Sequence, residues 1–205
     1  MDFLDILQNR HSVRKYSGEE ILQTVLLKVL QAGLLSPSSR AIYPWELIVV
    51  QKKDTLYKMS ECREGAAKML AGASAAIVVI ADKTKSDVWV EDCSIVMSNM
   101  HLMADSLGLG SCWIQGRMRN AADGQTTEAY LRNLLGYPEE FGLEAILSLG
   151  VPAAHAPRRE LSDLPMSKIH FESYLDGLPI NDTDTAPTLP TFQPAPSDTN
   201  FGREL

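Results

Sequence analysis

One segment, from Asp87 to Leu107, constrains the fold of this 205-residue chain more than any other. It reads DVWVEDCSIVMSNMHLMADSL, and as a helix it would be apolar around most of its circumference. A surface helix of a globular protein normally shows a single apolar stripe. We therefore expect a long helix that is covered on several sides, either in the core of the chain or against another subunit.

The rest of the chain predicts helices that alternate with single strands. In SGEEILQTVLLKVLQAGLLSPSS the apolar residues recur at helical spacing, so we expect a helix that Ser17 caps and that ends before Pro37. The other expected elements are a helix over 2–9, strands over 46–51, 75–82, 108–116 and 144–152, a broken helix over 54–73 and a helix over 127–136. This order favours an α+β sandwich. A doubly wound sheet would normally place a strand before its first glycine loop, and none is visible there.

Composition and charge limit the classes of function. The formal net charge is −7 and the isoelectric point is near 5.1, which argues against a nucleic-acid surface. No apolar run is long enough for a membrane span, and the first residues do not resemble a secretory signal. Cys62, Cys93 and Cys112 are odd in number and lack metal-ligand spacing, so we expect reduced thiols in a cytoplasmic protein without a metal site.

The sequence contains few residues that could perform chemistry by themselves. GLG at 108–110 lacks the third glycine of a dinucleotide fingerprint, and no P-loop or nucleophile elbow is present. We expect Cys112 to be a buried thiol and His101 to be a satisfied core or interface histidine. If the protein is an enzyme, a bound cofactor is therefore expected to supply the chemistry.

A basic stretch, RHSVRKY at 10–16, stands out in this acidic chain. It could be a solvated turn between two helices. In an extended conformation, however, alternation would place Arg10, Ser12 and Arg14 on one side, and guanidinium groups bind phosphate oxygens in a bidentate manner. Two further stretches could line a planar ligand: SPSSRAIYPW at 36–45, and GSCWIQGR at 110–117, where Gly116 would allow a ring to approach the backbone closely.

With these stretches identified, residues 1–174 resemble the FMN-dependent nitroreductase family. The resemblance rests on NRHSVRKY, SPSSRAIYPWELIVV, GLGSCWIQG and LSLGVP, which occur in the family's order and at nearly its spacing. It implies an α-β sandwich with a central mixed sheet flanked by helices. It also implies a domain-swapped type of homodimer, in which the long helices pack across the interface and two FMN sites are shared between subunits.

The resemblance also implies roles for particular residues. The phosphate, the ribityl chain and a ring oxygen would be held by Arg10, His11, Ser12 and Arg14, while the FMN bound mainly to the other subunit would be contacted by Pro37, Ser38, Ser39 and Arg40. The isoalloxazine would lie along Ile114, Gln115 and Gly116, with a backbone N–H facing N5, and Lys68 would reach its pyrimidine edge. After the last strand, either Arg158 or Arg159 would bind the phosphate.

The implied activity passes a hydride from NADH or NADPH through the flavin to a small-molecule acceptor, such as a nitroaromatic or a quinone, by ping-pong turnover. Two alternatives remain: a flavoenzyme of the same fold with desaturase-like or dehalogenase-like chemistry, and a non-enzymatic flavin-binding protein. This chain departs from the family at Ala41 and Tyr43, where an Asn and a Gln are frequent. The proline-rich residues 175–205 lie outside the resemblance, and we expect them to form an arm over the partner subunit.

Overall fold

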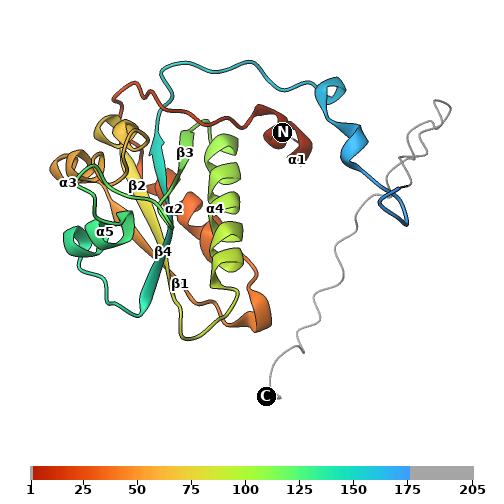
Figure 1. The fold of residues 1–205 in the computed structure, drawn as a ribbon. Helices are drawn as coiled ribbons and strands as arrows, with labels where there is room; N and C mark the ends of the chain where they lie inside the picture. The colour runs from red at the N-terminus through yellow and green to blue at the C-terminus, as the bar shows by residue number, and fades with distance from the viewer. Residues whose placement is uncertain (1, 176–205) are drawn as a thin grey trace, which may run out of the picture. The chain divides into compact units, whose positions relative to one another are not determined.

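The computed structural model describes residues 2–175, and these divide into two parts, 2–161 and 162–175. The first part is built on a four-stranded sheet with the strand order β1-β2-β4-β3 (Figure 1). The strands are β1 (Trp45–Val50), β2 (Ala75–Asp82), β3 (Gly110–Gln115) and β4 (Phe141–Gly150). All three strand pairs are antiparallel, so these strands do not form the expected mixed sheet. Within residues 2–175, the sheet has a parallel neighbour only at an isolated bridge between Ser12 and Ser111, which is too short to count as a strand.

Helices cover both faces of the sheet (Figure 1). One face carries α2 (Gln23–Leu34) and α4 (Trp89–Ser106), and α1 (Phe3–Asn9) contacts α4. The other face carries α3 (Lys53–Met59), the 3-10 helix η2 (Lys68–Gly72) and α5 (Thr127–Leu135). This arrangement confirms the α+β architecture expected from the sequence.

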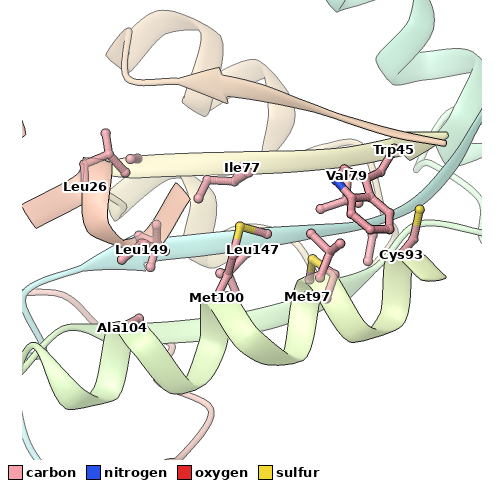
Figure 2. Packing of buried hydrophobic residues seen from close by; sticks show 14 of the residues in the cluster. Leu26, Trp45, Ile77, Val79, Cys93, Met97, Met100, Ala104, Leu147 and Leu149 are labelled. Atoms are coloured by element: carbon pink, nitrogen blue, oxygen red, sulfur yellow. The ribbon is translucent and has the colours of Figure 1, made fainter. Parts of the chain in front are cut away.

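Strand β2 lies between two hydrophobic clusters, and all eight of its residues are buried. Because successive side chains of a strand point to opposite faces, Ile77 and Val79 pack toward α4, whereas Val78 and Ile80 pack toward α3 and α5. Figure 2 shows Met97 and Met100 of α4 in the first of these clusters, directed at the sheet. The apolar run AAIVVIAD therefore forms the centre of the fold.

The long helix has two different faces. Its inward face is buried along its length, from Asp92 to Ala104. Its outward face lines an apolar groove of about 300 Å³, together with Phe3 of α1 and Leu35 at the end of α2. Leu35 is 84% exposed and Phe3 is 61% exposed, so this groove is an open apolar surface of the single chain.

Helix α2 begins later than the sequence predicts. Its first residue is Gln23, and Leu22 precedes it without a side-chain cap, so the prediction that Ser17 caps the helix is wrong. The Ser17 N–H donates to the carbonyl of Val151 at 2.9 Å, which ties this residue to the chain that follows β4. Gly18 then adopts a φ of +90°, and the chain remains non-helical as far as Leu22.

In the second part, the 3-10 helix η4 (Met166–Lys168) precedes a stacked pair of rings, His170 and Tyr174, whose centroids are 4.5 Å apart. The short helix η3 (Leu161–Asp163) spans the boundary between the two parts. The expected arm over 175–205 lies outside the described residues, apart from Leu175. A boundary after residue 174 therefore remains a prediction.

Candidate functional site

The sequence left two conformations open for the basic stretch, a solvated turn and an extended segment. The structure shows the extended one, which runs along the edge strand β3. Ser12 forms a parallel bridge to Ser111, and the Val13 N–H donates to the Ser111 carbonyl at 2.9 Å. Tyr16 fixes the far end, since its hydroxyl shares a hydrogen bond of 2.7 Å with the Ser148 hydroxyl. The two serines that anchor the stretch come from neighbouring strands, so the sheet edge positions the basic residues.

Two glycines allow this close approach. A Cβ atom added to Gly110 would lie 2.7 Å from a methyl carbon of Val13. A Cβ atom added to Gly150 would lie 2.5 Å from a ring carbon of Tyr16. Because real Cβ contacts are not this short, any other residue at either position would force the basic stretch away from the sheet.

Arg10 is held by a neutral partner within the fold. Its guanidinium lies 2.9 Å from Nε2 of His101, whose Nδ1 is hydrogen-bonded to the Ser111 hydroxyl. His101 is only 7% exposed. Burial first, and the Arg10 charge second, lower the pKa of this histidine to about 4. His101 is therefore neutral at pH 7 and orients the guanidinium without cancelling its charge.

The other basic residues of the stretch point outward. Arg14 donates from Nη1 to the Ser12 carbonyl at 3.3 Å, and both residues are exposed. None of the ion pairs among residues 2–175 involves Arg10 or Arg14. Nearby Cys112 is 2% exposed and burial raises its pKa, so the prediction of a buried thiol is confirmed.

The loop over 37–43 has a strained backbone. Arg40, Ala41 and Tyr43 have φ values of 54°, 51° and 50°, a region that side chains other than glycine rarely adopt. The loop is fixed by two hydrogen bonds of 2.8 Å, from the Ser39 N–H to Oδ1 of Asp92 and from the Tyr43 N–H to Oγ of Ser38. Arg40 forms an exposed ion pair with Asp87.

This loop and Arg10 contact opposite ends of the same helix. Ser39 is bonded to Asp92 in the first turn of α4, whereas Arg10 is bonded to His101, nine residues later. At 1.5 Å per residue, these two positions are separated by about 14 Å along the helix. Within one chain, therefore, the structure does not bring Ser38, Ser39 or Arg40 next to the basic stretch.

The segment from Ile114 to Gly116 presents its backbone and one side chain. Ile114 is 1% exposed and packs in the core, so only its backbone is available to a ligand. Gln115 accepts a hydrogen bond from Nε1 of Trp113 at 2.9 Å and donates to the Glu144 carbonyl at 3.3 Å. The N–H of Gly116 also donates to that carbonyl, at 3.2 Å.

Gly116 also has a role in packing within the chain. We expected it to give a ring access to the backbone, and this remains a prediction. A Cβ atom at this position would lie 2.5 Å from a methyl carbon of Leu143, so a larger residue would displace that side chain.

The last three predicted site residues are Lys68, Arg158 and Arg159, and they lie in two regions of the fold. Lys68 forms an exposed ion pair of 2.5 Å with Glu61, and none of the ion pairs within residues 2–175 links it to the basic stretch. Arg158 is paired with Asp5 at 2.6 Å and also contacts Gln8. The main chain of Arg159 exchanges two hydrogen bonds with Gln8, at 3.1 Å and 2.9 Å, which places both arginines beside the helix that leads into Arg10.

Two features of this region were not predicted from the sequence. The first is the pairing of His101 with Arg10, because helical spacing shows that a histidine is buried but not what it meets. The second is a pocket of about 450 Å³ that Arg63, Arg117 and Arg119 line together with residues of β3. Arg63 is far from the other two in sequence, and no local motif signals their meeting.

The structure is an α+β fold with a basic stretch that runs extended along one edge of its sheet. The model of the "Nitroreductase family" matches residues 7–66 and 59–151, and the chain belongs to this family. A protein of Archaeoglobus fulgidus named "Putative NADH dehydrogenase/NAD(P)H nitroreductase" is 38% identical over 176 residues, which cover 83% of this chain and 98% of that protein. A protein of the same name from Methanothermobacter thermautotrophicus is 33% identical, over 85% of this chain and 88% of its own.

A solved structure agrees with these relatives. The "FMN-dependent Nitroreductase" from Clostridium difficile R20291 superposes with a TM-score of 0.81 and 43% sequence identity, over 83% of this chain and 99% of that one. Among residues 2–175, no helix is both long and apolar enough to cross a membrane.

Proposed function

We propose that this protein is an FMN-dependent oxidoreductase that takes electrons from NADH or NADPH and passes them to nitroaromatic, quinone or similar acceptors. The observation that carries the proposal is Arg10, which a neutral histidine holds in place while its charge stays available. A bound phosphate needs such fixed cations, and Arg14 provides a second one on the same stretch. The relatives named above support the choice of cofactor and donor.

The residues of this chain fit such a cofactor in two ways. Arg10, Ser12 and Arg14 would bind the phosphate and the ribityl chain, with Arg159 as the more available of the two later arginines, because Arg158 is already paired with Asp5. The backbone of Ile114 and Gln115 would lie along the ring. FMN would supply hydride transfer at N5, and the buried, protonated Cys112 would take no part in it.

We further propose a homodimer with two shared sites. The strained loop over 38–40 and the basic stretch lie about 14 Å apart along one helix, so one FMN would meet the loop of one subunit and the stretch of the other. The open apolar groove along α4 offers a surface for the second copy. A cytoplasmic location remains a prediction, with which the three buried free cysteines agree.

An anaerobic absorbance titration tests the function. The protein is reconstituted with FMN, freed of excess cofactor and mixed with NADH or NADPH, and then with a nitroaromatic or a quinone. We expect a flavin band that bleaches with the nicotinamide and returns with the acceptor. Arg10→Gln should weaken FMN binding by roughly tenfold or more, since it removes a charge-assisted contact, while Lys28→Gln on the exposed face of α2 should not.

Other results would select the alternatives. A flavin band that neither nicotinamide bleaches would favour a desaturase-like or dehalogenase-like enzyme, or a flavin-binding protein without turnover. Failure to retain FMN at all would contradict the proposed site.

A further inference from the structure

Three arginines meet at a pocket on the edge of the sheet. The pocket has a volume of about 450 Å³ and is lined by Arg63, Trp113, Gln115, Arg117, Met118 and Arg119. Trp113 and Gln115 belong to β3, while Arg117, Met118 and Arg119 come one residue after its end. Arg63 comes from the turn after α3. We call this the arginine pocket.

The charges in the arginine pocket are not compensated. Among residues 2–175, none of the three guanidinium groups forms an ion pair, whereas Arg40, Arg132 and Arg158 each pair with a carboxylate. The contacts of Arg117 are the Sδ atom of Met118 at 3.4 Å and the face of the Trp89 ring at 5.9 Å. Three free cations in one pocket of a chain with a net charge of −7 point to an anionic ligand.

Among the described residues, the neighbouring acid forms no ion pair with these arginines. Glu144 is 3% exposed, and its burial raises its pKa although the Arg117 charge opposes this. Its side chain lies beside the Gln115 amide, at 3.5 Å. The carbonyl of Glu144 instead accepts the N–H of Arg117 at 2.9 Å, which fixes the start of the turn that carries Arg117 and Arg119.

The turn is built at a cost to the backbone. Met118 has a φ of +57° and is 78% exposed, so no burial of its side chain compensates for this conformation. Strained residues are characteristic of binding and catalytic sites. The conformation places two arginines, one on each side of Met118, on the same pocket.

The pocket also has an aromatic wall in a fixed orientation. The indole N–H of Trp113 donates to Oε1 of Gln115 at 2.9 Å, and the Gln115 amide in turn donates to the Glu144 carbonyl at 3.3 Å. Gln115 belongs to the segment proposed to lie along the flavin ring. An aromatic molecule in this pocket would therefore be next to the redox centre.

We propose that the arginine pocket binds the carboxylate of an aromatic electron acceptor, whose ring lies against Trp113. The inference rests on the proposed function and specifies its substrate class: aromatic acids in preference to neutral aromatics. Planar guanidinium groups match carboxylate oxygens in geometry and charge. The size of the pocket is that of a site for a small organic molecule.

The test compares two acceptors that differ in charge but hardly in shape, 4-nitrobenzoate and 4-nitrobenzamide. For the FMN-loaded protein, we expect a kcat/KM and an affinity by calorimetry that favour the acid by roughly tenfold or more, the usual size of a charge-assisted contact. Arg119→Gln and the double change Arg117→Gln with Arg119→Gln should remove this preference, mainly by lowering the affinity for the acid. Lys28→Gln removes one distant positive charge and should preserve it.

The remaining outcomes distinguish the pocket proposal from the proposed function. If the amide is reduced and the acid is neither bound nor reduced better, the pocket proposal is wrong and the proposed function stands. If neither compound is reduced, the nitroaromatic part of the proposed function fails, and calorimetric binding of the acid alone still decides the pocket. A loss of FMN affinity in Arg63→Gln or Arg119→Gln would assign the arginines to the cofactor. A changed ratio of kcat/KM for NADPH to kcat/KM for NADH in these variants would assign the arginines to the donor. Either of these results would overturn the proposal.

Discussion

Acidification should destabilise this protein through His101. The histidine is buried between Arg10 and Ser111 and is neutral at pH 7. Protonation would place two positive charges 2.9 Å apart at Nε2 in a site without a neighbouring ion pair. Burial and the Arg10 charge accordingly lower the pKa of His101 from 6.5 to about 4.

The size of the effect follows from these two values. Between pH 6.5 and pH 4 the unfolded chain binds a proton at this histidine and the folded chain does not, so stability rises with pH across this range. The contribution is fully present above the unfolded pKa and is lost as the pH falls toward the folded one. The expected loss is about 2 kcal/mol at pH 5 and about 3 kcal/mol at pH 4.

Urea unfolding of the wild type and of His101→Gln, at equal protein concentration and at pH 7, 5 and 4, measures this loss. Glutamine retains an acceptor for Arg10 and cannot titrate. Glu144, whose pKa is raised by burial, contributes in the opposite direction but is present in both proteins, so the difference between them isolates His101. If the free energy of unfolding falls equally in both proteins, the reasoning is refuted.

Two further substitutions test how the site and the fold are held together. Gly150→Ala should cost about 1–3 kcal/mol by overpacking, because the new Cβ atom would lie 2.5 Å from the Tyr16 ring, and it should also weaken FMN binding by displacing the basic stretch. Gly72→Ala is the control, since no atom lies within 4 Å of its Cβ position; equal melting temperatures for the two variants would contradict the packing argument. Thr126→Ala should cost about 1 kcal/mol in thermal or urea unfolding, because the Thr126 hydroxyl accepts the Ala129 N–H at 3.1 Å at the start of α5. Thr126→Ser retains the cap, and a serine variant as unstable as the alanine variant would exclude this role.

Local composition predicted the long helix and the central strand, but not where helix α2 begins. The long helix around Met97 and the central strand around Val78 were predicted because uninterrupted apolar composition leaves few ways to bury a segment. The start of α2 was misplaced because Ser17 has the right residue type for a cap. Its N–H instead binds the carbonyl of Val151, a contact between segments far apart in sequence.

At the site, too, contacts between segments far apart in sequence decided what the local pattern left open. Alternation placed Arg10, Ser12 and Arg14 on one side only if the basic stretch is extended, and its pairing with Ser111 of β3 decides that it is. The glycine at 116 was predicted to lie beside a ligand, and nothing in the sequence indicated that Leu143 also packs closely against it. A sequence shows where a side chain is missing but not which atom fills the space.

The sequence by itself determined the α+β class, the main elements and the four stretches that resemble the nitroreductase family, because these follow from periodicity and from motifs within short segments. Only the tertiary structure decided that His101 holds Arg10, that Arg63 joins Arg117 and Arg119, and that the loop at Ser39 lies at the far end of α4 from Arg10. Each of these depends on distances between residues far apart in the chain. Such distances are fixed by how helices and strands pack, and no local pattern of residues records them.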